Sequence, residues 1–319
     1  MTESKFGMKN AGQPTGLSSN KHIPVLLNEV LNSLNLHPNK VFVDGTIGSA
    51  GHSAEVARMF GESVRIIGLD RDADAVRRSE SKLSKLSKNF SLEVESFKNF
   101  GLVLKKLGVD SVDAILLDLG ISSDQLEASG RGFTFQNDEP LLMTMSEGSK
   151  EGELTASIIL NTWDEEALEL ILRGFGEEKF SKRIARAIVE RRDPSADGKP
   201  FVSTFDLVEA IESAVGKPRF GKINPATKTF QALRIAVNEE LQALTEGLEK
   251  AFKSLKLGGR LVVISFHSLE DRIVKNYFKA LAQDNLARVI NKKPIVPTED
   301  EKKENPRSRS AKLRVVEKV

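Results

Sequence analysis

The stretch VFVDGTIGSAGHS, residues 41–53, decides which fold the chain is expected to adopt. Three β-forming residues lead into Asp44, a loop rich in Gly, Ser and Thr follows, and AEVARM at 54–59 has helical character. The pattern predicts a strand, a tight loop and a helix. Glycine lets a loop backbone approach a ligand closely, and the helix N-terminus offers free N–H groups. The same pattern is also typical of an ordinary strand-to-helix turn.

A second apolar strand, SVRIIGL at 63–69, ends at Asp70. The separation between Asp44 and Asp70 is close to the roughly 20 residues expected between a nucleotide loop and a ribose-binding acid. A carboxylate at this place can accept hydrogen bonds from both ribose hydroxyls, although it can also serve as a helix N-cap. Asp70 is therefore a candidate cofactor residue.

The 44–53 loop lacks the G-x-G-x-x-G spacing of dinucleotide-binding enzymes, and it begins with an acid. An acid would repel a pyrophosphate but suits a ligand that carries an ammonium and a sulfonium group. S-adenosylmethionine is such a ligand. The loop, with Asp44, Gly45 and Gly51 as candidate cofactor residues, therefore favours a methyltransferase over a nicotinamide-dependent oxidoreductase, which remains an alternative.

The composition, 39% hydrophobic and 29% charged over 319 residues, is typical of a globular protein. The absence of cysteine excludes disulfides and fits a reducing cytoplasm. Four histidines without an H-x-x-x-H pair predict no dedicated transition-metal site. No apolar run reaches membrane-spanning length and no signal peptide is recognisable, so we expect a cytoplasmic protein without membrane contact. The net charge is only +2, so binding to nucleic acid would depend on local basic clusters.

Further strands at 90–94 and 112–118 alternate with helices, one of them at 101–107. This alternation predicts a parallel, doubly wound α/β sheet. Ligands of such sheets bind outside the carboxyl ends of the strands. The segments expected to meet at this edge are the 44–53 loop, Asp70, Phe97 after the third strand and Asp118 at the end of the fourth.

The pattern changes between Asp124 and Asn224, where helical segments dominate. We therefore expect a discontinuous core at 21–123 and 225–319, with a helical insertion at 124–224. The polar residues 1–20 are expected to form a disordered tail.

Several local expectations concern the helices and the strands after the fourth strand. Thr204 is the expected N-cap of a helix at 204–215. One long helix is expected at 229–255, ended by Gly258-Gly259, followed by a strand at 260–266. Ser268 and Asp271 have capping-box spacing at the next helix. We expect a charged loop at 292–307 and a last strand at 310–319.

The residues of this chain resemble a known family, the bacterial ribosomal RNA small subunit methyltransferase H family. The resemblance extends from His22 to Lys318. Its motifs in this chain are HIPVLLNEV (22–30), DGTIGSAGHS (44–53), DAILLDLGISSDQL (113–126), RGFTF (131–135), GEEKFSKRIARAIVE (176–190), NPATKTFQALRIAVNEEL (224–241), ISFHSLEDRIVKNYF (264–278) and NPRSRSAKLRVVEK (305–318).

The resemblance implies a class I (Rossmann-like) fold and methyl transfer from S-adenosylmethionine to N4 of a cytosine in the decoding region of 16S rRNA. Asp70 would hold the ribose hydroxyls and Phe97 would pack near the adenine. The target nitrogen would lie near Asp118. A homodimer is one oligomeric state open to the chain. The cofactor residues that carry over from the family are Ala50, Gly51, His52, Asp70, Phe97, Asp118 and Gln125.

The chain departs from the family pattern in two places. Ala50 stands where the family usually has glycine, and its methyl group is tolerated if φ is negative there. Leu142 and Thr144 replace an acid and an arginine. If those two form a salt bridge, their joint loss is close to neutral. If either contacts the target base, activity or substrate choice changes, and a non-catalytic ribosome-binding protein becomes an alternative.

The mechanism needs a hydrogen-bond acceptor for the amino group, because the cytosine nitrogen is a poor nucleophile. Asp118 or a backbone carbonyl at 119–122 could accept, and His267 could take the proton late. His267 is equally compatible with a buried histidine at a strand end. The target base must leave its stack to enter such a pocket.

RNA contacts are expected from local basic clusters. The 182–192 helix alone suggests a solvated face paired with Glu177, Glu178 and Glu190, and the family resemblance favours phosphate contacts. The candidates are Lys182, Arg183, Arg186, Arg191 and Arg192, then Lys217, Arg219, Lys222 and Lys228, and finally Arg307 and Arg309.

Overall fold

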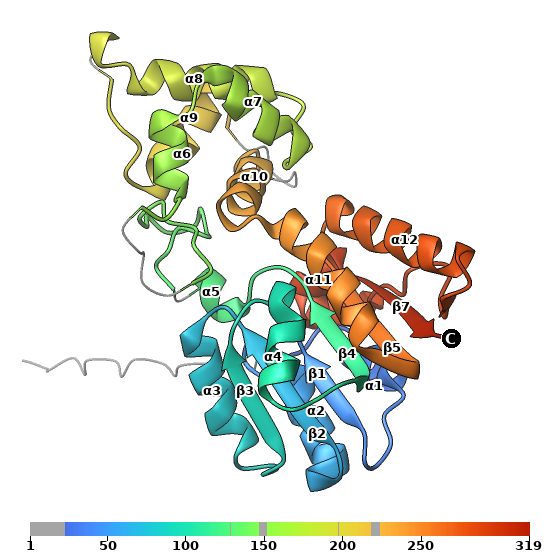
Figure 1. The fold of residues 1–319 in the computed structure, drawn as a ribbon. Helices are drawn as coiled ribbons and strands as arrows, with labels where there is room; N and C mark the ends of the chain where they lie inside the picture. Colours follow the sequence, from blue (N-terminus) through green and yellow to red (C-terminus); the bar gives the residue numbers. More distant parts are fainter. Residues whose placement is uncertain (1–22, 128, 147–151, 197, 218–223) are drawn as a thin grey trace, which may run out of the picture.

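The computed structural model describes residues 23–127, 129–146, 152–196, 198–217 and 224–319 (Figure 1). The tail expected at 1–20 lies outside the described residues, as do Arg219 and Lys222.

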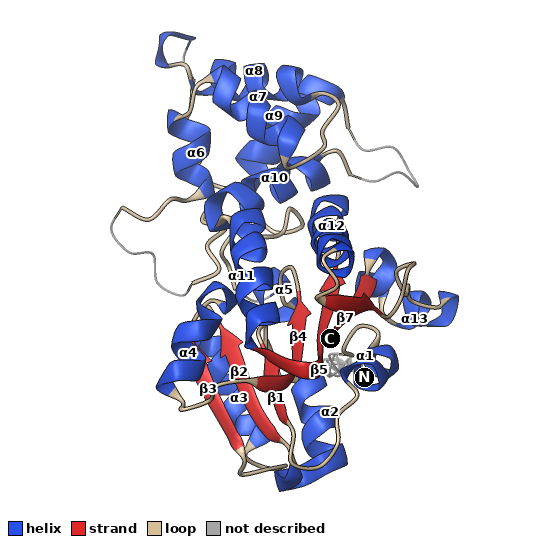
Figure 2. Ribbon diagram, turned by 45° about the vertical axis from the view of Figure 1, so that its right-hand side comes forward, coloured by secondary structure: helices blue, strands red, loops and turns tan. Residues whose placement is uncertain are grey.

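The centre of the molecule is a seven-stranded sheet with the order β3-β2-β1-β4-β5-β7-β6 (Figure 2). Strands β1 to β5 run parallel, and β7 is antiparallel to both of its neighbours, β5 and β6. The expected doubly wound, mostly parallel α/β sheet is confirmed. The strands are β1 Val41–Asp44, β2 Arg65–Asp70, β3 Phe90–Val94, β4 Val112–Asp118, β5 Leu255–Ser265, β6 Ala287–Val289 and β7 Lys312–Lys318.

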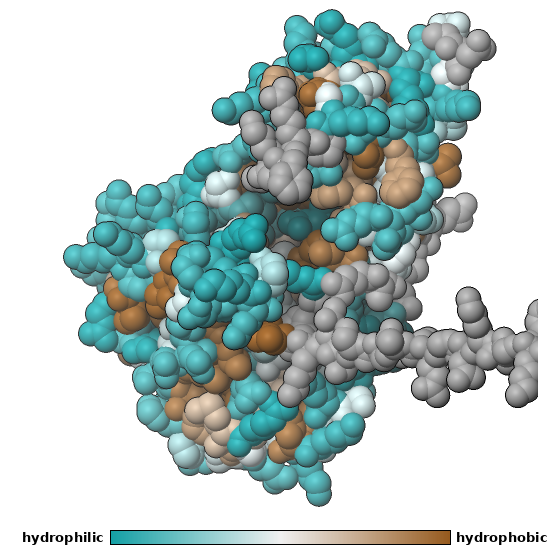
Figure 3. All heavy atoms as spheres, turned by 180° about the vertical axis from the view of Figure 1, so that it is seen from behind, coloured by the Kyte–Doolittle hydropathy of each residue, from teal (hydrophilic) through white to brown (hydrophobic). Residues whose placement is uncertain are grey.

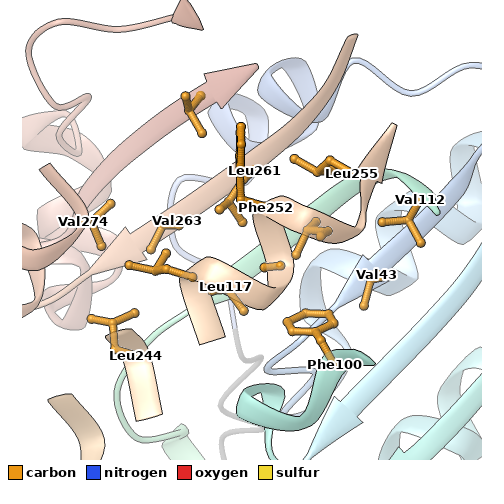
Figure 4. Packing of buried hydrophobic residues seen from close by; sticks show 14 of the residues in the cluster. Val43, Phe100, Val112, Leu117, Leu244, Phe252, Leu255, Leu261, Val263 and Val274 are labelled. Atoms are coloured by element: carbon orange, nitrogen blue, oxygen red, sulfur yellow. The ribbon is translucent and has the colours of Figure 1, made fainter. Parts of the chain in front are cut away.

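Helices cover both faces of the sheet, because successive side chains of a strand point to opposite faces. In β4, Ile115 and Leu117 join one buried cluster, and Ala114 and Leu116 join the other. Figure 4 shows Leu117 and Val263 of the first cluster beside Phe252 of a covering helix. The first cluster lies under α4 Phe100–Lys106, α11 Glu240–Ser254 and α12 Ser268–Gln283, and the second under α1 Leu27–Leu34, α2 Gly51–Phe60 and α3 Ala73–Leu83.

A third buried cluster belongs to a separate helical part of the molecule, seen above the sheet in Figure 1. It contains Phe230 and Leu233 of α10, so the packing extends past the boundary expected at residue 224. The helices of this part are α6 Ala156–Thr162, α7 Glu165–Gly174, α8 Ser181–Arg192, α9 Thr204–Val215 and α10 Ala226–Asn238.

The single helix expected at 229–255 is wrong, because the chain forms two helices, α10 and α11. Glu239 separates them in a left-handed conformation, with φ 50°. The break has a packing reason: α10 belongs to the third cluster, whereas α11 covers the sheet.

The strand after α11 begins earlier than expected. Gly258 and Gly259 lie inside β5 rather than at a helix end. The pairing of β5 with β4 shifts register between Val112 and Ala114. A side chain at Gly259 would meet the carbonyl oxygen of Asp113 at 3.1 Å, so glycine permits this close approach.

Two helix caps differ from the expected ones by one residue. Ser203, not Thr204, caps α9, because the Thr204 hydroxyl instead donates to the carbonyl of Asn137 at 2.7 Å. His267 and Glu270 form the capping box of α12 in place of Ser268 and Asp271. The Asp271 carboxylate is engaged by Arg314 at 2.6 Å.

Shorter elements complete the described chain. The charged loop expected at 292–307 contains α13 Glu299–Glu304 and the start of the 3₁₀ turn η4 Pro306–Ser310. The remaining short helices are α5 Ser123–Glu127, η1 Gly61–Ser63, η2 Phe97–Asn99 and η3 Pro194–Ala196.

The surface in Figure 3 is mostly hydrophilic, and the hydrophobic residues on this face gather in separate patches. Within the described part of the chain, none of the helices combines the length and apolar character needed to cross a bilayer.

Candidate active site

A cavity of about 510 Å³ lies along the carboxyl ends of five neighbouring parallel strands. Its volume is in the range that holds a small ligand. The lining residues follow the strand order: Phe97 after β3, Asp70 at the end of β2, Gly45 after β1, Asp118 at the end of β4 and Phe266 after β5. The structure therefore brings together the strand ends that the sequence pattern placed at one edge.

Asp44 supports the cavity from behind, and it is not among the residues that line it. Only 2% of its surface is exposed. Its carboxylate accepts hydrogen bonds from the Ser53 hydroxyl at 2.6 Å and from the amide of Thr46 at 3.3 Å. Burial raises the pKa of Asp44 to about 6. The acid predicted to face a cationic ligand thus holds the loop in place.

Gly45 is required by close packing. A β-carbon at this position would lie 2.6 Å from a methyl carbon of Leu117 and 3.0 Å from the ring of Phe100. The backbone of Gly45 and Gly51 lines the cavity instead of a side chain.

Ala50 adopts a left-handed conformation, with φ 51° and ψ 43°, as the N-cap of α2. Its methyl group would be tolerated without strain only at negative φ, and the observed φ is positive. An alanine in this region costs roughly 1–2 kcal/mol relative to its favoured conformations. Ala50 is fully buried and shapes the loop without lining the cavity.

Asp70 lines the cavity and organises the loops beside it. One carboxylate oxygen accepts from the amide of Gly48 at 2.9 Å, and the other accepts from the amide of Asp72 at 3.0 Å. Burial raises the pKa of Asp70. Each oxygen keeps acceptor capacity toward the cavity, because a carboxylate oxygen can accept more than one hydrogen bond.

His52 and Gln125 line the cavity, and part of each side chain contacts protein groups. Nε2 of His52 lies 3.0 Å from the carbonyl of Val25, and its Nδ1 lies 3.8 Å from Asp118. The Gln125 side-chain oxygen accepts from the amide of Ser122 at 3.0 Å. Both residues therefore help to fix the walls.

Asp118 carries the most distinctive polar atom of the cavity. Its Oδ1 is buried and has no hydrogen-bond partner, although a buried polar atom normally has one. Burial, with smaller contributions from Asp44 and Glu270, raises the pKa of Asp118 to about 8. Its backbone amide donates to the Thr46 hydroxyl at 2.7 Å. This oxygen is available to a ligand that can donate a hydrogen bond.

The charge of the cavity wall is strongly asymmetric. Two arginines, Arg71 and Arg307, face a larger set of acids. Such a wall attracts a cationic ligand and disfavours the entry of a phosphate. The lining acids are Asp70, Glu95, Asp118, Asp124, Glu240, Glu270 and Glu304.

His267 does not appear among the lining residues; it caps α12. Its Nδ1 accepts from the amide of Glu270 at 3.4 Å, and its Nε2 lies 3.2 Å from the Glu270 carboxylate without hydrogen-bond alignment. The structure thus places His267 behind Glu270, which does line the cavity.

The ligand atoms of Glu240, His267 and Glu270 lie within 4.8 Å of one another, a grouping that the sequence spacing did not reveal. Arg234 already donates to both oxygens of Glu240, at 2.7 and 2.9 Å. A metal ion at this place would have to compete with the guanidinium, so we interpret the group as an ion-pair network.

The two substituted residues of the motif at 140–145, Leu142 and Thr144, do not line the cavity. Thr144 is 2% exposed, and Leu142 is half-buried. Of this motif, Met145 reaches the cavity. The two replacements therefore alter the protein around the site and leave its wall in place.

The basic residues of α8 divide into two groups. Arg191 pairs with Asp206 at 2.5 Å and with Glu209 at 2.8 Å, and Arg192 donates to the carbonyls of Leu160 and Trp163. These two arginines hold helices together.

The other α8 cations are exposed. Lys182 and Arg186 point to the surface beside a shallow pocket, and Arg186 lies 3.7 Å from Glu165. Arg183 lines the same pocket but donates to the carbonyl of Ala214.

Two of the acids expected to pair with α8, Glu177 and Glu178, have other partners, and Glu178 accepts from the amide of Phe180 at 2.8 Å. Glu177 accepts from Ser268 at 2.5 Å and from Arg272 at 3.0 Å, both in α12, and so links the helical part to the sheet. Lys228 donates to the backbone of Glu177 at 2.8 Å. Near the chain end, Arg307 lines the cavity, and Arg309 is exposed.

Several residues that line the cavity were not predicted from the sequence. Glu95 and Phe266 each follow a strand directly, which is the rule that found Asp70 and Asp118. Glu240 carries no such signal because it begins a helix. Ile23 and Val25 reach the cavity beside the segment at 304–307, because Asn305 donates to the carbonyl of Ile23 at 3.0 Å.

Known proteins that are similar in sequence to this chain match it over nearly its whole length. The chain is 46% identical over 298 residues to ribosomal RNA small subunit methyltransferase H of Dictyoglomus thermophilum, covering 93% of this chain and 96% of that protein. It is 43% identical over 313 residues to the protein of the same name from Carboxydothermus hydrogenoformans, covering 93% and 98%.

Among solved structures, a putative methyltransferase from Streptococcus mutans in complex with SAH superposes with a TM-score of 0.46 at 12% identity, covering 93% of this chain and 100% of that one. The model of the MraW methylase family matches residues 19–319. With this match and two relatives above 40% identity, the chain belongs to the MraW methylase family.

Proposed function

We propose that this protein transfers a methyl group from S-adenosylmethionine to N4 of a cytosine in the decoding region of 16S rRNA, within the small ribosomal subunit. Membership in a methylase family and the names of its relatives support methyl transfer to small-subunit rRNA. The observation that carries the site assignment is the unpartnered Oδ1 of Asp118, buried in an acidic cavity at the strand ends.

The residues present fit S-adenosylmethionine. The acidic wall suits its sulfonium and ammonium groups, and Asp70 at the end of β2 is placed to accept hydrogen bonds from ribose hydroxyls. Gly45, Gly51 and His52 shape the loop against it, and Phe97 offers an apolar surface to the adenine. When bound, S-adenosylmethionine supplies an activated methyl group with a neutral thioether as leaving group.

Asp118 accepts a hydrogen bond from the amino group of the target base in this proposal. The bond holds the nitrogen in line for attack and concentrates electron density on it. A cation bound nearby favours the charged form of a carboxyl, so binding counteracts the raised pKa of Asp118. His267 acts through Glu270, which it contacts, rather than on the base itself.

RNA is held outside the cavity, since the acidic wall disfavours phosphates. Lys182 and Arg186 on α8 and Arg309 near the chain end are the proposed phosphate contacts outside the cavity, and Arg307, which lines the cavity, is the proposed contact where the target base enters it. The target base must flip out of its stack to reach Asp118. A cytoplasmic location and a homodimer remain predictions.

A non-catalytic ribosome-binding role is the competing proposal, motivated by Leu142 and Thr144. It loses support because neither side chain lines the cavity.

The test is transfer of a labelled methyl group from S-adenosylmethionine to small subunits purified from cells that lack this gene. We expect one labelled cytosine, identified by mass spectrometry as the N4-methylated base. Label at another atom or in another RNA would contradict the substrate assignment, and no transfer at all would favour the non-catalytic role.

A further inference from the structure

The cavity is longer than the cofactor site needs. Adjacent strands lie about 4.8 Å apart, so the ends of β3 and β5, four spacings apart, are separated by roughly 19 Å. The proposed cofactor residues Phe97, Asp70 and Gly45 lie at or after the carboxyl ends of β3, β2 and β1, on one side of this row. On the side formed by β4 and β5, Asp118 is the one residue assigned so far to the methyl acceptor.

Phe266 lies at this second side. Among the described lining residues, the phenylalanines are Phe97 and Phe266, and they follow the two outermost strands of the row. Phe266 is half-buried and comes two residues after Ile264, the neighbour of Asp118 in the sheet. Its ring packs over Gly120, where a β-carbon would lie 3.5 Å from Cδ2 of the ring. Gly120 also has φ 96°, which disfavours any side chain there.

Glu270 lies beside this ring. It is 3% exposed and still lines the cavity. One oxygen accepts from the backbone amides of Phe266 at 2.8 Å and His267 at 3.3 Å, so the carboxylate is fixed against the backbone of the residue that carries the ring. Burial opposes its charge, but the neighbouring His267 and Arg234 outweigh burial and hold the pKa of Glu270 below its usual value. A charged carboxylate can accept hydrogen bonds and cannot donate them.

We propose that Phe266 and Glu270 form the acceptor subsite, in which Phe266 stacks on the flipped base and Glu270, with Asp118, selects a base that presents an exocyclic amino group. The inference rests on the proposed function. Stacking on an aromatic ring suits any base, so it supplies affinity without selection. Selection comes from the two carboxylates once S-adenosylmethionine, a cation, favours the charged form of Asp118, because a carbonyl at the same position, as in uracil, would then face acceptors alone.

The first experiment tests Phe266 with single-turnover methyl transfer to small subunits, with Phe60→Leu as the matched control. Phe60 packs against the same buried cluster as Phe266 but does not line the cavity. We expect Phe266→Leu to lower kcat/KM for subunits about 10- to 100-fold, the loss typical of one base–aromatic stack. Affinity for S-adenosylmethionine, measured by calorimetry, should stay within about threefold, and Phe266→Tyr should restore the rate because it keeps the ring.

The second experiment tests Glu270 by competition between RNA hairpins that carry cytidine or uridine at the target position. The wild-type protein should bind the cytidine hairpin more tightly than the uridine hairpin. Glu270→Gln should reduce this ratio of affinities about tenfold, since an amide can donate a hydrogen bond to a carbonyl. Glu178→Gln is the control, because Glu178 is also a buried glutamate and accepts from the amide of Phe180 outside the cavity.

The outcomes separate the two proposals. A wild-type protein that transfers no methyl group would overturn the proposed function and the acceptor subsite with it. An active wild type in which Phe266→Leu behaves like Phe60→Leu, or in which Glu270→Gln keeps the full preference for cytidine, would overturn the acceptor subsite alone.

Discussion

At the scale of single residues, Asp118 combines a buried, unpartnered oxygen with a place at the end of the central strand β4. Asn keeps the shape and one acceptor oxygen but removes the charge. We predict that Asp118→Asn lowers the rate of methyl transfer about 100-fold, as expected for loss of a positioned polar group. Single-turnover transfer at saturating S-adenosylmethionine checks this, and a wild-type rate would remove Asp118 from the chemistry.

The same substitution should stabilise the ligand-free fold in a pH-dependent way. The pKa of Asp118 is about 8 in the folded protein, and an unfolded aspartate titrates near 4. Between about pH 4 and pH 8 the folded state holds a proton that the unfolded state has lost, so this group's contribution to stability falls as pH rises. The melting temperature of Asp118→Asn minus that of wild type should therefore increase from pH 4 to pH 8. A constant difference across this range would show that Asp118 titrates normally.

The role of Asp70 can be tested directly by measuring the affinity of the protein for S-adenosylmethionine. Asp70→Ala should weaken S-adenosylmethionine binding by about 1–3 kcal/mol, because buried polar partners are left unpaired. Isothermal calorimetry measures this change. Asp74→Ala is the control, since Asp74 pairs with Arg77 outside the cavity. Equal affinities for both variants would exclude Asp70 from the site.

Ala50 tests backbone strain in the loop. Ala50→Gly should raise the free energy of unfolding by about 0.5–1 kcal/mol. Glycine adopts positive φ without the clash of a β-carbon, and this gain exceeds the conformational entropy that glycine loses on folding. Denaturant titration gives the value. Ala54→Gly, inside helix α2, should have the opposite sign and cost about 1 kcal/mol. Destabilisation by both variants would mean that the Ala50 methyl group contributes more by packing than it costs in strain.

At the scale of elements, helix α8 shows why a basic cluster in a sequence is ambiguous. Arg191 and Arg192 hold neighbouring helices, whereas Lys182 and Arg186 face the surface. A periodic pattern places residues on one helix face, but the partners of that face come from other helices, α6 and α9, whose packing the pattern does not specify.

This division predicts different outcomes for two sets of α8 variants. Lys182→Gln with Arg186→Gln should weaken binding to small subunits and reduce the slope of log affinity against log salt by about two. Arg191→Gln should lower stability and leave that slope unchanged. Filter binding over a salt series and thermal denaturation measure the two effects. An unchanged slope in the double variant would make α8 a solvated face.

At the scale of the whole molecule, the sheet and the helical part have separate buried clusters, joined where α10 continues into α11 and where Glu177 contacts α12 (Figure 1). S-adenosylmethionine should bind the sheet side, because the proposed cofactor residues follow its strands. Hydrogen exchange should therefore slow in β1, β2 and β4 on binding, and much less in α7 and α9. Equal slowing in both parts would show that they open as one unit.

The sequence by itself determined that strands β1 to β4 alternate with helices, and it determined the edge of the sheet at which their carboxyl ends build a cavity. Apolar runs such as 112–118 form buried parallel strands by their composition alone, and parallel strands place their carboxyl ends side by side. Asp70, Phe97 and Asp118 were therefore predictable as neighbours from their positions just inside or beyond strand ends.

Only the tertiary structure decided which of those residues face the cavity and which support it. Asp44 ends a strand just as Asp118 does, yet Ser53 of the next helix draws its carboxylate inward. The positive φ of Glu239, which ends α10, follows from the two clusters that the helices must join. Burial, hydrogen-bond partners and backbone strain depend on contacts between residues distant in the chain, so no local pattern contains them.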